Sequence, residues 1–138
     1  MARSPIWPPS SPSEDCIERV SRRSRLGADE AFGATEAVLE ALGDRISRGQ
    51  VDDLAARLPA ELARALKRGR ARSKGAARPR SVDEFLRIIS DRERGTPEQA
   101  KEHAQAVFAT LREAVGEREF ADTVAQLPKD YAPVLARP

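Results

Sequence analysis

The sequence predicts an all-α fold, a pseudo-symmetric bundle of about eight helices built from two tandem repeats. The 138-residue chain is 40% apolar but only 4% aromatic. Its commonest residues, Ala, Arg, Glu and Leu, are strong helix formers. The segment AARLPAELARAL at 55–66 returns as VAQLPKDYAPVL at 124–135. Apolar residues recur at helical spacing in both halves, so composition, repetition and periodicity agree on helices.

The two copies align over residues 14–66 and 83–135 without a gap, at an offset of 69 positions. Most differences at apolar positions exchange one apolar side chain for another, as an internal duplication would. One copy alone would bury too little surface, so we expect the two to cover each other's apolar faces. The predicted divisions are a Pro/Ser-rich disordered tail at 1–12, repeat one at 13–66, a basic linker at 67–81 and repeat two at 82–136.

Each copy reads as a short helix, a long helix and two further short helices. The start signals are capping boxes, in which a Ser or Thr and a Glu or Gln three residues later satisfy each other's backbone donors. They are Ser11 with Glu14, Ser81 with Glu84, and Thr96 with Gln99. The long helices carry the stripes Thr35, Val38, Leu39, Leu42 and Ile46, and Ala104, Val107, Phe108, Leu111 and Val115. Gly49 marks the predicted break after the first long helix.

The Leu-Pro dipeptides at 58–59 and 127–128 predict a corner between the last two helices of each copy. Leu anchors one helix on the core, whereas Pro cannot continue that helix but suits the first turn of the next. The additional Pro133 predicts a short or kinked final helix in copy two. A docking surface is the alternative interpretation of the repeated dipeptide.

The segments VDEFLRII, TPEQAKEHAQAVFATLREAV and EFADTVAQLPKDYAPVL follow one another in copy two. With the phrase A-x-x-L-P-x-x-(Y/L) closing each copy, this pattern resembles the bacterial family catalogued as domain of unknown function 2267. The resemblance covers about 14–135. It implies an all-helical fold and supplies no activity or catalytic residues. The strongly basic connector departs from the family's usual pattern.

The connector KRGRARSKGAARPRS at 67–81 contains seven basic residues and no acid. Such a run can bind phosphates in a salt-dependent, sequence-independent way, although no aromatic residue is present for base stacking. The alternatives are a solvated linker and a simple extension of the preceding helix. The candidate phosphate-binding residues are Lys67, Arg68, Arg70, Arg72, Lys74, Arg78 and Arg80.

Other candidate residues are few. Glu36, Glu40 and Asp44 form an acidic row at helical spacing, which we interpret as a solvated helix face because a two-metal site needs a Glu-x-x-His pattern that is missing here. His103 aligns with Ala34 and is expected at the edge of the long helix. Cys16 aligns with an apolar position and is expected to be a small buried side chain. We therefore expect no catalytic residue, metal or other cofactor.

The N-terminal tail contains the only Trp, Trp7, between prolines. It is either a short extended docking motif or a disordered terminus. The single cysteine excludes an internal disulfide and suits a reducing compartment. No segment resembles a signal peptide or a membrane-spanning helix. The expectation is a cytoplasmic protein without a membrane partner.

The net charge is only +2, so the total charge does not indicate a nucleic-acid partner. The first functional hypothesis is a non-enzymatic helical protein-interaction or scaffold module, able to self-associate. The alternative is weak, sequence-independent binding of nucleic acid, or of an anionic surface, through 67–81. An enzyme is the third hypothesis, and no small-molecule substrate is indicated.

Overall fold

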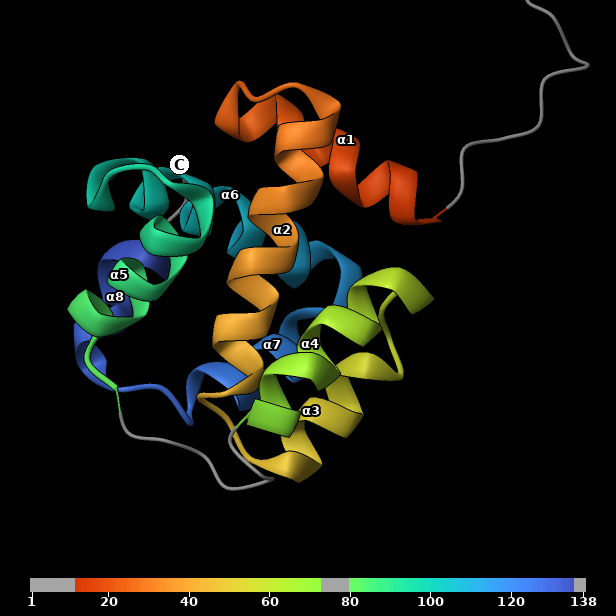
Figure 1. The fold of residues 1–138 in the computed structure, drawn as a ribbon. Coiled ribbons are helices and arrows are strands. Elements are labelled where there is room, and N and C mark those ends of the chain that lie inside the picture. The colour runs from red at the N-terminus through yellow and green to blue at the C-terminus, as the bar shows by residue number, and fades with distance from the viewer. Residues whose placement is uncertain (1–11, 73–79, 136–138) are drawn as a thin grey trace, which may run out of the picture.

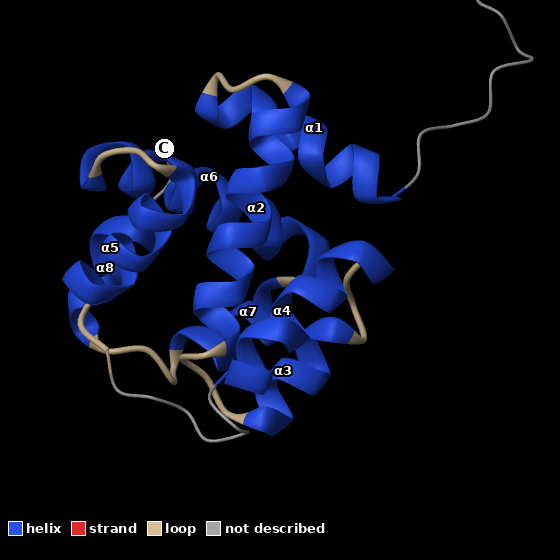
Figure 2. Ribbon diagram, in the orientation of Figure 1, coloured by secondary structure: helices blue, strands red, loops and turns tan. Residues whose placement is uncertain are grey.

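A computed structural model describes residues 12–72 and 80–135 of the chain. This part of the chain consists of helices joined by short turns and contains no strand (Figure 2). The prediction of an all-α bundle of eight helices is confirmed. The helices are α1 Pro12–Ser24, α2 Ala28–Gly43, α3 Arg48–Ala55, α4 Ala60–Arg72, α5 Val82–Glu93, α6 Pro97–Val115, α7 Glu117–Val124 and α8 Ala132–Leu135, the last preceded by the 3₁₀ turn η1 Lys129–Tyr131.

Local signals set several helix boundaries. The Ser81 side chain accepts from the Glu84 amide at the start of α5, and the Glu84 carboxylate accepts from the Ser81 amide. Thr96 and Gln99 make the same reciprocal pair at the start of α6. These two boxes each satisfy two backbone donors that a helix start leaves open. The third predicted box begins at Ser11, which lies outside the described residues.

The end of the first long helix differs from the prediction. α2 ends at Gly43, and Gly49 lies inside α3 rather than at a break. The Ser47 hydroxyl accepts a 3.2 Å hydrogen bond from the Gln50 amide and so defines the start of α3. A serine N-cap is a stronger boundary signal than a glycine in this position.

The long helices α2 and α6 form the centre of the bundle, with α6 behind α2 in the view of Figure 1. α1 packs on both of them, and so does α5. α4 packs along one side of α2, and α3 packs on α4 and α7. Each long helix therefore contacts the short first helix of both copies, so neither copy forms a core by itself.

The positions of the helices agree with the 69-residue offset. α2, α3 and α4 begin at Ala28, Arg48 and Ala60, and α6, α7 and η1 begin 69 positions after each of these. The side chains of Gln50 and Glu119, which are equivalent in the alignment, share a 2.8 Å hydrogen bond. Contact between equivalent positions is typical of a two-fold relation. The pseudo-symmetry of the two copies stays a prediction.

An aromatic cluster fills the second copy. Phe85 lies 6.1 Å from Phe108 and 5.1 Å from Tyr131, measured between ring centroids. The Tyr131 hydroxyl donates a 3.1 Å hydrogen bond to the Arg80 carbonyl, and burial is the main reason that the pKa of Tyr131 is raised to about 12. The aligned positions in copy one carry smaller side chains, namely Cys16, Leu39 and Leu62.

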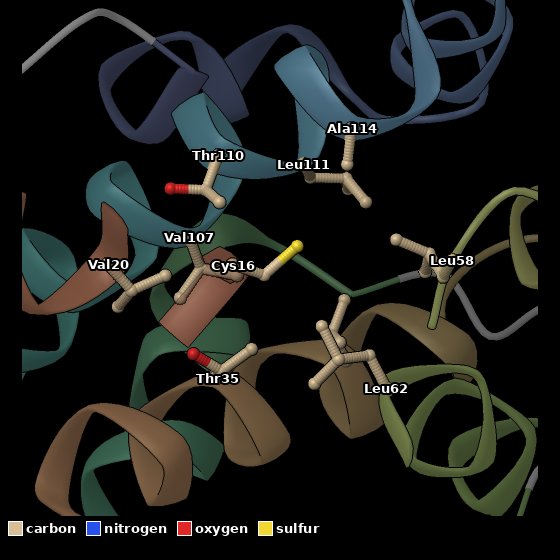
Figure 3. Close-up of a pocket in the computed structure, with 10 residues that line it drawn as sticks. Cys16, Val20, Thr35, Leu58, Leu62, Val107, Thr110, Leu111 and Ala114 are labelled. Atoms are coloured by element: carbon tan, nitrogen blue, oxygen red, sulfur yellow. The ribbon is translucent and has the colours of Figure 1, made fainter. Parts of the chain in front are cut away.

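These smaller side chains border a small apolar cavity between α1, α2, α4 and α6 (Figure 3). Its volume is about 10 Å³, and Cys16, Leu39 and Leu62 are among its lining residues. An apolar space that barely admits one water molecule is expected to stay dry. The cavity is therefore a packing defect where copy one lacks aromatic rings, rather than a ligand site.

Each Leu-Pro dipeptide lies at a corner between two helices. α3 ends at Ala55 and α4 begins directly after Pro59, whose carbonyl accepts a 2.9 Å hydrogen bond from the Ala63 amide. In copy two, η1 begins directly after Pro128, and α8 is only 4 residues long, as Pro133 predicts. Leu58 and Leu127 are partly buried and pack against the core, which agrees with the predicted corner in each copy.

The tightest helix contact is the crossing of α2 and α4. A Cβ atom at Gly43 would overlap the Leu66 carbonyl oxygen, and one at Gly69 would overlap the Glu40 carbonyl oxygen. Both clashes are with backbone atoms of the facing helix, which cannot rotate away. Only glycine at these two positions permits the two backbones to approach so closely.

Replacing Gly69 with Ala is expected to destabilise the protein by about 2–3 kcal/mol, because the added methyl group must separate α2 from α4. Gly33→Ala is the matched control, because Gly33 is also inside a helix and its added Cβ would meet nothing within 4 Å. That control is expected to stabilise the protein by about 0.5–1 kcal/mol. Urea unfolding measures both changes, and equal effects at the two positions would contradict the close crossing.

Candidate functional site

The basic connector is partly helical. α4 continues to Arg72. The first six residues of the predicted linker 67–81 are therefore the last residues of this helix. This was the third interpretation of the connector, and it holds for 67–72. Lys67 lies exposed on α4. Lys74 and Arg78 lie outside the described residues.

The interpretation of the acidic row on α2 as a solvated face is wrong. Glu40 is only 3% exposed, Asp44 is buried, and Glu36 is partly buried. The spacing of these carboxylates follows one side of α2, but α4 and α5 pack on that helix. The row therefore faces other elements and needs positive partners in the interior of the bundle.

Arginines supply those partners. Arg68 Nε lies 2.8 Å from the Glu40 carboxylate, Arg72 lies 3.0 Å from it, and Arg92 also contacts it. Arg68 reaches Glu36 as well, at 3.0 Å. Arg68 and Arg72 come from α4, whereas Arg92 comes from α5 in the other copy. One buried carboxylate thus joins α2 to helices of both copies.

The remaining described arginines of the connector are also paired. Arg80 Nε lies 3.0 Å from Asp44 at the end of α2. Arg70 contacts Asp52 on α3. Four of the seven predicted phosphate-binding residues therefore contact carboxylates of the protein itself, which compete with an external phosphate for the same guanidinium groups.

The surroundings of Glu40 act on its ionisation in opposite directions. Burial raises the pKa of Glu40, but hydrogen bonds from Arg68 and Arg92 and the charges of Arg92 and Arg72 outweigh burial and hold the pKa below its ordinary value of 4.5. Glu40 is thus ionised at neutral pH. Its negative charge stabilises three arginines that would otherwise repel one another.

Cys16 and His103 are both held in packed surroundings. Burial raises the pKa of the Cys16 thiol, which disfavours the reactive thiolate. His103 Nδ1 lies 2.8 Å from the Glu93 carboxylate, and this hydrogen bond is the main reason that the pKa of His103 is raised. This pair could not be predicted from helical spacing, because Glu93 precedes His103 by ten positions across a turn.

A large charged hollow of the described residues lies elsewhere, between α1, α6 and α7. One cavity of about 490 Å³ and another of about 610 Å³ share Arg22, Arg23 and Glu113 as lining residues. We name the two cavities together the arginine groove. Its other lining residues are Arg19, Arg25, Phe108, Ala109, Arg112, Glu117, Phe120 and Leu135.

Two arginines of the groove are fixed by carboxylates of α6 and α7. Arg23 donates to both oxygens of Glu113, at 3.0 and 2.6 Å, and to the Thr110 hydroxyl at 2.8 Å. Arg112 makes a similar bidentate pair with Glu117, at 2.8 and 2.7 Å. Bidentate pairs define the orientation of a guanidinium group. These contacts give the groove a defined rim.

The sequence contains a second basic segment that the sequence analysis did not identify as a candidate site. The stretch RVSRRSR at 19–25 carries four arginines and no acid. It was missed because its partner helix α6 lies about ninety positions away along the chain. The described connector arginines thus contact carboxylates of the protein, whereas the arginines of 19–25 border a groove that the sequence analysis did not predict.

In the described ranges 12–72 and 80–135, no group of three or more His, Cys, Asp or Glu side chains could hold a metal ion. No helix in these ranges combines the length and the apolar character needed to cross a bilayer.

Glu40→Gln is expected to lower the free energy of unfolding by about 2 kcal/mol at pH 7, because it leaves three arginines without their shared anion. The matched control Glu36→Gln affects a more exposed carboxylate with a single arginine partner, and should cost less than about 1 kcal/mol. Because the pKa of Glu40 is lowered in the folded state, its contribution is complete above pH 4.5 and is lost as the pH falls through the folded pKa. Urea unfolding of both variants between neutral and acidic pH measures this, and a Glu40→Gln effect independent of pH would contradict the assignment.

His103 is the only histidine, so its ring protons can be followed by NMR without ambiguity. Its pKa is expected above the ordinary 6.5 in the native protein and lower in Glu93→Gln. Because the folded pKa is raised, the stabilisation from the pair is full below pH 6.5 and is lost as the pH rises through the folded pKa. An unchanged pKa in Glu93→Gln would show that the pair does not form in solution.

Comparison with known proteins agrees with the resemblance drawn from the sequence. The family model described as uncharacterized conserved protein (DUF2267) matches residues 13–134. This range includes every described helix except the first residue of α1 and the last of α8. The comparison with curated proteins found no match. The chain belongs to the DUF2267 family of uncharacterized conserved proteins.

Proposed function

We propose that the protein is a non-enzymatic helical interaction module that binds a protein partner through the arginine groove. The main support for this proposal is the pair of adjoining cavities between α1 and α6–α7. Their volumes are about 490 and 610 Å³, and arginines line both of them. A concave surface with oriented charged groups is typical of a recognition site. The partner is another protein or a second copy of this chain.

The state of the reactive side chains supports a non-enzymatic role. The Cys16 thiol is buried, with a raised pKa. His103 is paired with Glu93 rather than with a nucleophile. Nucleophilic and acid–base catalysis both need an activated group within reach of a base or substrate. A single buried cysteine also fits a reducing compartment, and we propose a cytoplasmic location.

Nucleic-acid binding through 67–81 stays an untested prediction. The ion pairs of Arg68, Arg70, Arg72 and Arg80 with carboxylates stand against it, because each must be broken or shared before a phosphate can bind. Lys67 is exposed on α4. No observation in the described residues favours this alternative over the groove.

A photo-crosslinking amino acid placed at position 22 is expected to form discrete polypeptide adducts in cells that produce the protein naturally. Arg22 lines both cavities of the groove. The same amino acid at position 64, on the exposed side of α4, is the matched control. The adducts from position 22 should disappear when Arg25 is changed to Glu, because that change alters the charge of the groove. Mass spectrometry of the purified adducts identifies the partner, and identical adducts from both positions would contradict the proposal.

A further inference from the structure

We infer that the arginine groove receives an acidic, amphipathic helical segment, which presents carboxylates beside an apolar side chain. The inference rests on the proposed function and names the chemistry of the partner. Three features of the described residues support it: the spacing of the arginines, the absence of strong ion-pair partners for some of them, and the apolar residues that line the groove with them.

The arginines of α1 follow one side of the helix. Arg19, Arg22 and Arg23 are spaced three and four positions apart, which places them on a common face. Arg25 lies just beyond the last residue of α1, Ser24. At 1.5 Å per residue, Arg22 lies about 4.5 Å and Arg23 about 6 Å from Arg19 along the axis of α1. Carboxylates spaced three to four residues apart on an opposing helix repeat at the same distances.

These arginines are not all equally available. Arg23 is held by Glu113, as described above, and fixes the geometry of the rim. The Arg22 side chain is 71% exposed and has only a long contact of 3.5 Å with Glu18. Arg25 is exposed and makes no ion pair with any residue in the described ranges. A partner carboxylate can therefore approach Arg22 and Arg25 without displacing a strong internal pair.

The inner part of the groove offers hydrocarbon surface. Ala109 on α6 and Leu135 at the end of α8 are half-buried and line the groove, next to the almost fully buried Phe108 and Phe120. The Arg112 guanidinium lies 5.7 Å from the centroid of the Phe120 ring, which keeps the cation beside the apolar floor. An apolar side chain between two carboxylates of the partner thus has apolar atoms to contact.

The same features disfavour a phosphate polymer. Glu113 and Glu117 line the groove, and their negative charges disfavour a phosphate polymer, which carries a charge on every unit, more than a peptide with a few spaced carboxylates. Phe108 and Phe120 are almost entirely buried, so neither ring presents a face on which a base could stack. An acidic peptide needs only the few available arginines and uses the apolar floor as well. The observations favour the peptide over nucleic acid.

The test measures fluorescence anisotropy of a labelled amphipathic peptide of about 18 residues, long enough to form a helix, with Glu along one face and Leu along the other. Matched peptides carry Gln or Lys in place of every Glu, and labelled single-stranded DNA is the second class of probe. The protein variants are Arg22→Glu with Arg25→Glu, and the control Arg64→Glu with Arg87→Glu, whose two positions are exposed and line neither cavity. Circular dichroism checks that all of them fold.

The inference predicts that the Glu peptide binds the native protein and the control equally, and binds the groove variant at least about ten-fold more weakly. The Gln peptide should bind weakly and the Lys peptide not at all, and binding should weaken at high salt. Should the double reversal fold poorly, Arg22→Gln is expected to show a smaller loss in the same direction.

Equal binding of the Glu and Lys peptides would overturn the inference, and so would equal affinity of the groove and control variants. DNA binding that is lost only in the groove variant would assign the groove to nucleic acid instead. If crosslinks form at position 22 but the Glu peptide fails to bind, the interaction function stands and the acidic class of partner is wrong.

Discussion

The close contact of the α2 and α4 backbones at Gly43 and Gly69 is the constraint on which the arrangement of charges depends. Because neither glycine has a Cβ, the helices approach closely enough for Arg68, the neighbour of Gly69, to reach Glu40 one turn before Gly43. A wider crossing would leave a buried carboxylate without its hydrogen-bonding partner, which is strongly unfavourable. Backbone packing and ion pairing at this crossing therefore require each other.

This crossing also explains why the basic connector differs from a free cationic arm. The arginines that end α4 lie over the acidic side of α2, and Arg92 from α5 adds a cation from the second copy. Glu40 thus stabilises the contact between copies as well as the contact between α2 and α4. The cations at the end of α1 have a different environment, since Arg22 and Arg25 line a groove and have no strong internal partner. An arginine that is paired with a carboxylate of the protein has a structural role, whereas an arginine without such a partner is available for binding. The number of arginines in a segment does not distinguish the two.

Sequence reasoning succeeded where the signal was local and failed where it was not. The capping boxes at Ser81 and Thr96, and the short helix at Pro133, depend on residues within four positions, and the structure confirms them. The acidic row was misjudged because carboxylates four positions apart are typical of exposed helix faces, and nothing near Glu40 in sequence shows that Arg68 and Arg92 will pack over it. The groove was missed for the same reason, because Arg23 and Glu113 meet only in the folded chain. Tertiary contacts between distant helices leave no pattern in either helix alone.

The central claim is that the described connector arginines are paired with carboxylates of the protein itself, and a double-mutant cycle between Arg68 and Glu40 tests it most directly. Arg68→Gln, Glu40→Gln and the double variant are compared with the native protein by urea unfolding at neutral pH. The account predicts a favourable coupling free energy of about 1–2 kcal/mol, because the two side chains share a hydrogen-bonded ion pair of which one partner is buried. A coupling near zero would show that Arg68 is free in solution, and the connector would again be a candidate for binding phosphates.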